Sequence, residues 1–138
     1  GAALARPKAR VLCVSGDGSI QMNLQELATL AELDLPVTVL IMNNGELGMV
    51  RQQQELFYDR ALIATKFSKR LDFGALASQF GLRSYSVYDP DRLEEVLMEA
   101  FSMPSPTVID VHVRDAGNVF PIVPPGAANR DMIAGCHG

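Results

Sequence analysis

The sequence has no tryptophan, only two cysteines, and no hydrophobic run long enough to cross a membrane. Without an apolar stretch of about 18 residues or more, a transmembrane helix is excluded. Cys13 and Cys136 lie near opposite ends of the chain, so we expect reduced thiols of a cytosolic protein, not a disulfide or a metal site. Lysines and arginines, 12 against 16 acidic residues, are spread along the chain, which argues against a nucleic-acid partner.

Length and composition indicate one globular domain. The chain has 138 residues, of which 48% are hydrophobic and 20% charged, and its formal net charge is −4. That is enough chain for one sizeable core and too little for two ordinary domains. The opening stretch "GAALARPKAR" looks like the last turn of a helix whose beginning is missing, so we expect a piece of a longer protein.

Four apolar runs of strand length alternate with helical patterns. Strands are expected at residues 10–15, 37–42, 83–88 and 106–113. Helices are expected at residues 23–33, from about residue 47 or 48 onward, at 72–81 with Asp72 as N-cap, and at 89–102. This alternation predicts the α/β class, with three layers, α/β/α, around a mostly parallel central sheet. The first strand is expected to be buried, and Cys13 with it, as inert packing.

Two polar turns follow the first two expected strands. "GDGS" contains Asp17 and Ser19, and "NNGELG" begins with Asn43 and Asn44. If the strands are neighbours in a parallel sheet, the turns meet at its carboxyl edge, where ligands bind. A carboxylate, an amide oxygen and backbone carbonyls suit Mg²⁺, and glycine N–H groups at helix starts suit the phosphates that complete its octahedron. The pattern therefore favours a metal-bridged phosphate or diphosphate.

The same turns have an ordinary structural explanation. Glycine and asparagine tolerate left-handed backbone angles and are common where a strand ends. Each turn alone therefore indicates nothing more than chain reversal, and only their occurrence after successive strands favours a site. Residue chemistry leaves both interpretations open.

The two turns together resemble the thiamine diphosphate motif, which begins with GDG and ends with a double asparagine. The segment "GDGSIQMNLQELATLAELDLPVTVLIMNNGELGMVRQQQELFY" and the tail "NVFPIVPPGAANRDMI" are similar to the C-terminal cofactor-binding domain of acetolactate synthase large subunits. The likeness covers nearly the whole chain. It implies that residues 1–115 form the thiamine diphosphate and magnesium domain, and that residues 116–138 form a C-terminal arm or active-site lid.

The resemblance also implies the roles of individual residues. Mg²⁺ would be held by the side chains of Asp17 and Asn44 and by the backbone carbonyl of Glu46. The cofactor site as a whole would contain Gly16, Asp17, Gly18, Ser19, Asn44, Glu46, Leu47, Gly48 and Met49. The carboxylate of Glu46 is not required for metal binding, and a solvated side chain is the simpler expectation for it.

The family decarboxylates a 2-oxo acid such as pyruvate on thiamine diphosphate and then ligates or releases the product. Its activating glutamate belongs to an N-terminal pyrimidine-binding domain of the same or another subunit, usually within a homo-oligomer, and is absent here. No catalytic residue is therefore expected in this chain, and the 138 residues alone are expected to be inactive.

The sequence departs from the family at the substrate side. Plant and fungal acetolactate synthases carry a tryptophan a few residues after "GMV", where this chain has Gln53, so the resemblance leaves open whether 2-oxobutyrate, another acceptor or plain decarboxylation applies here. Met22, Arg51 and Gln53 are the substrate-facing candidates. The competing explanation is a polar helix face beside a core methionine. His112, a lone histidine on the last strand, is expected to be structural.

Two further hypotheses remain open at this stage. The chain has the length of a cofactor-binding subunit of a split thiamine diphosphate decarboxylase, whose two domains are encoded separately. It is also compatible with a non-catalytic phosphate- or metal-binding module that kept the fold.

Overall fold

The computed structural model describes residues 1–114 and 117–135. The strands are β1 (Val11–Gly16), β2 (Val37–Asn43), β3 (Arg83–Val87) and β4 (Thr107–His112). The helices are α1 (Ala2–Ala5), α2 (Asp17–Gln21), α3 (Glu26–Glu32), α4 (Gly48–Phe57), α5 (Phe73–Gln79) and α6 (Leu93–Ser102). Two 3₁₀ turns, η1 (Pro90–Arg92) and η2 (Asn129–Asp131), complete the described elements.

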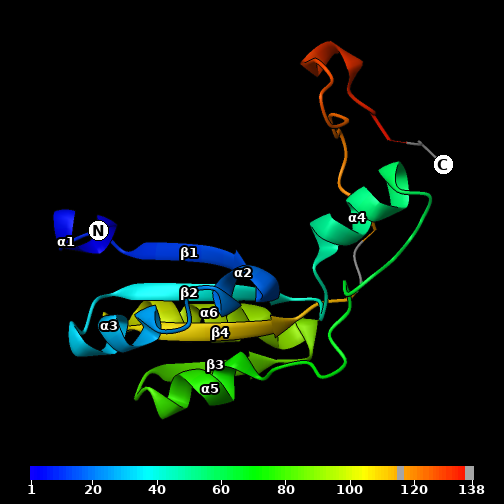
Figure 1. Cartoon of the computed structure of the whole chain (residues 1–138). Coiled ribbons are helices and arrows are strands. Elements are labelled where there is room, and N and C mark those ends of the chain that lie inside the picture. Colours follow the sequence, from blue (N-terminus) through cyan, green and yellow to red (C-terminus); the bar gives the residue numbers. More distant parts are fainter. Residues whose placement is uncertain (115–116, 136–138) are drawn as a thin grey trace.

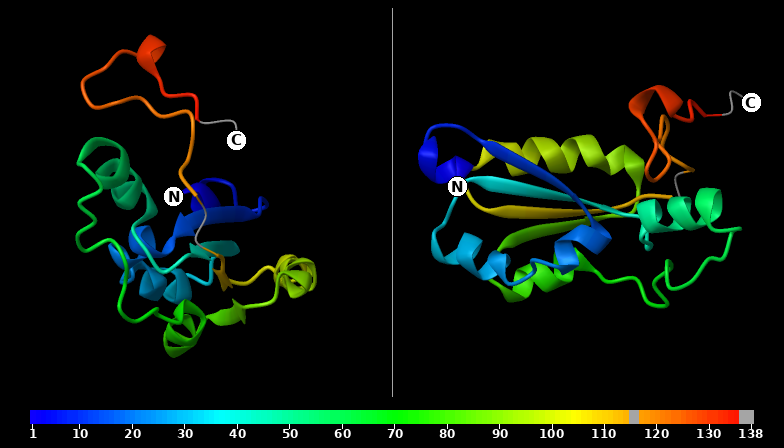
Figure 2. Two further views of the ribbon diagram at one scale, coloured as in Figure 1. Left: turned by 90° about the vertical axis from the view of Figure 1, so that its right-hand side faces the viewer. Right: turned by 45° about the horizontal axis from the view of Figure 1, so that its top comes forward.

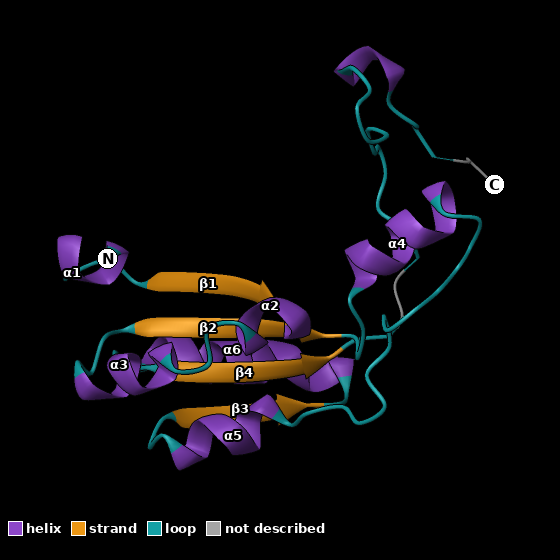
Figure 3. Ribbon diagram, viewed as in Figure 1, coloured by secondary structure: helices purple, strands orange, loops and turns teal. Residues whose placement is uncertain are grey.

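The four strands form one parallel sheet in the order β1-β2-β4-β3. All four therefore end at the same edge, where α4 and the connecting loops lie (Figure 3). Because β4 inserts between β2 and β3, the last strand of the sequence becomes a central one. Residues 107–111 of this strand are all buried, as a central strand covered on both faces requires.

Helices cover both faces of the sheet, as the right-hand view of Figure 2 shows. On one face, α3 and α5 pack on β2 and β4 in a cluster that includes Leu27, Ile41, Phe73 and Val108. On the other face, α6 packs on β4 and β3. The predicted α/β fold with a parallel central sheet is confirmed, and the helical periods supplied the apolar faces that bury it.

The expectation that β1 is buried, together with Cys13, is wrong. β1 is an edge strand, and Cys13 is exposed together with Leu12 and Val14, which are 46% and 61% exposed. An apolar run of strand length does not reveal whether a strand lies inside the sheet or at its edge. In this chain the position at the edge decides the exposure.

The helix expected at 23–33 is shorter than predicted, and a separate helix precedes it. α2 starts at Asp17, directly after β1, and α3 follows from Glu26 to Glu32. The "GDGS" turn is therefore the first turn of a helix. Asp72, by contrast, is the N-cap of α5 as expected, because its Oδ1 accepts from the Ala75 N–H at 2.8 Å.

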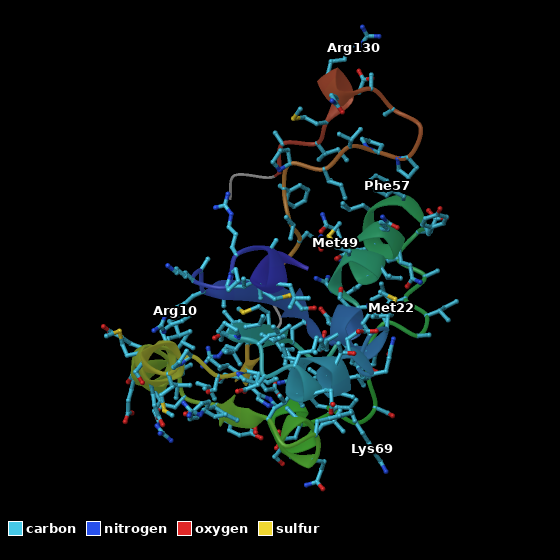
Figure 4. All side chains as sticks on the ribbon, turned by 90° about the vertical axis from the view of Figure 1, so that its left-hand side faces the viewer. Arg10, Met22, Met49, Phe57, Lys69 and Arg130 are labelled. Atoms are coloured by element: carbon cyan, nitrogen blue, oxygen red, sulfur yellow. The ribbon has the colours of Figure 1, made fainter. Side chains whose placement is uncertain are left out.

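Helix α4 and the described tail, residues 117–135, project together beyond the sheet (Figure 1). The Gln52 side chain joins them, since its Nε2 donates to the Val119 carbonyl at 2.7 Å and its Oε1 accepts from the Val119 N–H at 2.8 Å. Farther along, Ile122 and Ile133 form an antiparallel bridge. Arg130 marks the distant end of the tail (Figure 4).

The expected boundary between residues 115 and 116, and the expectation for Cys136, lie outside the described residues. Among the helices in the described part of the chain, none has the length and apolar character needed to cross a membrane.

Candidate functional site

Asp17 joins the two polar turns. Its side chain is buried, its Oδ2 accepts from the Gly45 N–H at 2.7 Å, and its Oδ1 accepts from the Gly18 N–H at 2.8 Å. β1 and β2 are adjacent, with Gly16 opposite Met42 in register, so the residues that follow each strand meet. The two turns predicted to meet at this edge therefore do so through a carboxylate.

The second turn is held by backbone hydrogen bonds to the loop that follows α4. The Leu47 N–H donates to the Thr65 carbonyl at 2.7 Å, and the Phe67 N–H donates to the Gly45 carbonyl at 3.0 Å. Gly45 has a φ of 75°, in the region that favours glycine. The Arg70 Nη2 donates to the Asn44 carbonyl at 2.7 Å. These contacts hold the backbone of the turn, and the Asn44 Oδ1 accepts from the Glu46 N–H at 3.2 Å.

A cavity of about 720 Å³ opens between the two turns and the start of α4. All nine residues that the resemblance assigned to the cofactor line it: Gly16, Asp17, Gly18, Ser19, Asn44, Glu46, Leu47, Gly48 and Met49. Met22, a substrate-facing candidate, also lines the cavity, and Met22 and Met49 lie on the same side of the molecule (Figure 4). The volume lies within the range of small-molecule and cofactor sites.

Three apolar lining residues were missed by the sequence reasoning, namely Met42, Val50 and Val113. Met42 lies near the end of β2, and Val113 directly follows β4. Their position at the carboxyl ends of strands was a usable signal. For Val113 this signal is not sufficient by itself, because Val113 reaches the cavity only if β4 lies beside β2. Only the strand order of the sheet shows that it does.

The other two substrate-facing candidates, Arg51 and Gln53, do not line the cavity. Arg51 is held by carboxylates, with its Nε 2.9 Å from Glu46 Oε1 and its Nη1 2.9 Å from Glu55 Oε2. Gln53 is exposed on α4. The Glu46 side chain is only 2% exposed, so the expectation of a solvated carboxylate is wrong. Its ion pair with Arg51 compensates for the burial.

The two glycines of "GDGS" differ in how much space a side chain would have at each position. A Cβ at Gly18 would overlap the terminal methyl of the Leu47 side chain on the opposite turn, so any larger residue there requires Leu47 to move. Gly16 has an extended backbone with φ −92°, and a Cβ would meet nothing within 4 Å. At Gly16 the fold does not require a glycine.

The site offers anion-binding groups from helix α4. Leu47, the N-cap of α4, makes no side-chain cap hydrogen bond. The N–H groups of Gly48, Met49 and Val50 lie in the first turn, where a helix has no internal acceptors, and all three residues line the cavity. A diphosphate beside this helix start would supply the missing acceptors and interact favourably with the helix dipole.

The side chains present also suit a hard cation that shares its ligands with a phosphate. Within residues 1–114 and 117–135, no three His, Cys, Asp or Glu side chains are grouped to hold a metal ion by themselves. Asp17 and Asn44 nevertheless line one cavity and carry a carboxylate and an amide oxygen. Mg²⁺ usually takes few protein ligands and completes its octahedron with phosphate oxygens and water. The donor set therefore fits Mg²⁺ only together with a phosphate ligand.

Comparison with known proteins identifies relatives over almost the whole chain. The chain is 48% identical over 134 residues to an acetolactate synthase large subunit of Parasynechococcus marenigrum. It is 43% and 40% identical, each over 133 residues, to the large subunits of acetolactate synthase isozymes 1 and 2 of Escherichia coli. In each case the match covers 96% of this chain and 22–24% of the relative.

A family match agrees with these relatives. The family described as "Thiamine pyrophosphate enzyme, C-terminal TPP binding domain" matches residues 1–111, which include both polar turns, the first three strands and all of β4 except its last residue. The chain therefore belongs to the thiamine pyrophosphate enzymes, as a C-terminal TPP binding domain of that family.

Proposed function

We propose that this chain anchors the diphosphate of thiamine diphosphate through Mg²⁺, as part of an acetolactate synthase-like enzyme that acts on a 2-oxo acid such as pyruvate. The observation that carries the proposal is the hydrogen bond from Gly45 to Asp17, which brings both halves of the motif to one cavity. Relatives that are named acetolactate synthase large subunits support the enzyme class.

The roles of the anchoring groups are those that the family resemblance implies, and the chemistry of each group suits its role. Asp17 would contribute a carboxylate oxygen to Mg²⁺, Asn44 its amide oxygen, and Glu46 its backbone carbonyl. Gly48 and Met49 would donate their free helical N–H groups to the phosphate oxygens. The buried carboxylate of Asp17 has no cationic side chain in contact within the described residues, and a divalent cation would compensate that charge.

The chemistry that thiamine diphosphate supplies when bound is addition to the keto carbon of a 2-oxo acid and acceptance of the electrons released as carbon dioxide leaves. This chain would orient the cofactor by holding its diphosphate, and Met22, Met42 and Val113 give the cavity an apolar wall. The activating glutamate would come from an N-terminal pyrimidine-binding domain, in the same or another subunit. The matched relatives are about four times longer than the chain, which leaves room for such a domain.

Calorimetric titration of thiamine diphosphate into the protein, with and without Mg²⁺, tests the anchoring role. We expect Mg²⁺ to strengthen binding in the unsubstituted protein. Asp17→Asn should lose about tenfold or more of that enhancement, since one metal ligand loses its charge. Asp34→Asn, which removes an exposed carboxylate at the end of α3, is the matched control and should behave like the parent. Equal binding with and without Mg²⁺ would contradict the metal assignment.

A separate assay addresses the missing activating group. The 138 residues alone should not consume pyruvate when thiamine diphosphate and Mg²⁺ are supplied. Turnover by the isolated chain would show that the group that activates the cofactor lies within these 138 residues. The proposal that a separate domain supplies it would then be wrong.

A further inference from the structure

Two fully buried polar side chains lie directly behind the turn that carries Asn44. Asn43 is the last residue of β2, and Asp110 lies in β4, which is the neighbouring strand. The Asn43 Nδ2 donates to Asp110 Oδ2 at 3.3 Å and to the Leu71 carbonyl at 3.0 Å. The residue before the proposed metal ligand is thus held by its side chain on two sides.

The Oδ2 atom of Asp110 is contacted by groups from several elements. It also accepts from the Phe73 N–H at 2.9 Å, at the start of α5, and the His112 Nε2 lies 3.4 Å from the same atom. The His112 ring stacks on Tyr88, with ring centroids 4.1 Å apart. This carboxylate therefore links β2, β4 and the beginning of α5.

The backbone of Asn43 is held as well. Asn43 lies opposite His112 in the β2–β4 register, and its carbonyl accepts from the Val113 N–H at 3.0 Å. Val113 is itself a wall of the cavity. Side-chain and main-chain bonds together determine both where β2 ends and the direction in which the chain leaves it.

The energetic cost of this arrangement makes packing alone an inadequate explanation. Burial raises the pKa of Asp110, although hydrogen bonds from Phe73 and Asn43 oppose the rise, so the carboxylate is held where its charge is disfavoured. Apolar side chains of similar size would fill the same space without that cost. Apolar side chains would not fix the orientation of the chain at the end of β2, because hydrogen bonds constrain orientation and apolar contacts do not.

We propose that Asn43 and Asp110 are positioning residues for the metal and diphosphate site. They hold the end of β2 so that the Asn44 amide oxygen and the Glu46 carbonyl face the position of Mg²⁺, while neither side chain contacts the ligand itself. Outer groups that orient metal ligands commonly affect metal affinity without touching the metal. The inference rests on the proposed function.

The test uses the complete protein and measures the metal enhancement, defined as the ratio of the dissociation constants of thiamine diphosphate without and with Mg²⁺. We expect Asp110→Leu, which removes the acceptor, to lower the enhancement by about tenfold. Asn43→Ser, which shortens the donor, should act in the same direction. Asp110→Asn keeps an oxygen that accepts from both Phe73 and Asn43, so it should retain the parent value. This rescue separates hydrogen-bond positioning from any need for charge.

Thr107→Val is the matched control for stability. Thr107 is fully buried at the opposite end of β4, and its Oγ1 donates to the Ser105 carbonyl at 3.2 Å. Its substitution should lower the thermal unfolding temperature of the ligand-free protein and leave the metal enhancement unchanged. If Asp110→Leu behaves in the same way, the two side chains are structural only and the inference is wrong.

Two further outcomes keep the test decisive. If Asp110→Leu yields no folded protein, Asn43→Ser alone decides, because it leaves the bond between Phe73 and Asp110 in place. Failure of the unsubstituted protein to bind thiamine diphosphate would overturn the proposed function. Normal binding by the parent with unchanged enhancement in Asn43→Ser would overturn the positioning role alone.

Discussion

The carboxylate of Asp17 accepts a hydrogen bond from the Gly45 N–H at 2.7 Å, although the two residues are 28 positions apart in the chain. The bond joins the turns after β1 and β2 without any ligand. Asp17 is buried and still has acceptor capacity, because a carboxylate can accept at several lone pairs. The binding groups are therefore arranged in advance, which reduces the entropy lost when a ligand binds.

The contact between Gly18 and Leu47 predicts the effect of adding one methyl group. Gly18→Ala should lower the free energy of unfolding by about 1–3 kcal/mol, because the methyl overlaps Leu47. It should also weaken thiamine diphosphate binding, since Leu47 is displaced toward the cavity that it lines. Chemical denaturation and calorimetry measure the two effects. Gly16→Ala should leave the free energy of unfolding unchanged, and Leu47→Ala should rescue the stability of Gly18→Ala. Identical behaviour of Gly16→Ala and Gly18→Ala would disprove the close approach.

The ion pair between Arg51 and Glu46 predicts a stability effect inside the site. Arg51→Met should lower the free energy of unfolding by about 1–3 kcal/mol, because the Glu46 carboxylate is 2% exposed and the hydrogen bond from the Arg51 guanidinium is lost. Arg60→Met is the control, since the Arg60 side chain is 76% exposed in its pair with Glu55 and should matter little. Urea denaturation measures both. If Arg51→Met leaves the free energy of unfolding unchanged, the ion pair with Glu46 does not stabilise the fold, and this prediction is wrong.

The N-cap of α5 predicts a pH-dependent contribution to stability. The Ala75 N–H, and then the Ser86 hydroxyl, hold the pKa of Asp72 below its ordinary value. The unfolded-state pKa of an aspartate is about 4, and above that pH the stabilisation from a lowered pKa is complete. The stabilisation is lost as the pH falls through the folded-state pKa. Asp72→Ala should therefore be less stable than the parent by about 1 kcal/mol at neutral pH.

The difference between Asp72→Ala and the parent should shrink as the solution is acidified. Denaturation curves measured from neutral to acidic pH give the comparison. Asp72→Asn keeps a capping oxygen that does not titrate, so its advantage over Asp72→Ala should persist in acid. A difference between Asp72→Ala and the parent that stays constant with pH would show that the carboxylate does not provide the cap.

The two hydrogen bonds between Gln52 and Val119 predict how the tail is attached. Gln52→Glu keeps an acceptor for the Val119 N–H but removes the donor to its carbonyl, and it buries a charge beside it. We expect faster hydrogen exchange at the Val119 amide and faster proteolysis within residues 117–123. Gln53→Glu makes the same change on the exposed neighbour and should leave both rates unchanged. Equal rates in the two variants would mean that Gln52 does not hold the tail.

Much of the site was predictable from local sequence, for physical reasons. Strand-length apolar runs and helical periods determine which segments form strands and helices, and turns that follow parallel strands must emerge at one edge. Asp17 and Asn44 accordingly line one cavity, and their roles as ligands stay a prediction. The start of α2 was missed because glycine has a low helix propensity, and packing on β1 and β2 overrides that propensity at Gly18.

The fate of the charged side chains could be read only in part from their neighbours in the chain: the i,i+4 spacing of Arg51 and Glu55 on α4 was a local signal, and the pairing of Arg51 with Glu46 was not. Arg51 was placed on a substrate-facing surface, but it pairs with Glu46 and Glu55. Glu46 was expected in solvent and is buried. Both outcomes depend on how α4 leaves the turn, which is a tertiary property.

What the sequence by itself determined is the set of elements, their order, the parallel sheet and the two turns that meet at its edge. What only the tertiary structure decided is the strand order β1-β2-β4-β3. That order exposes Cys13 on an edge strand, makes Val113 a wall of the cavity, and places Asp110 beside Asn43 across 67 residues of chain. The physical reason is that hydrophobic periodicity specifies which face of an element is buried, while the neighbour that buries it depends on long-range packing.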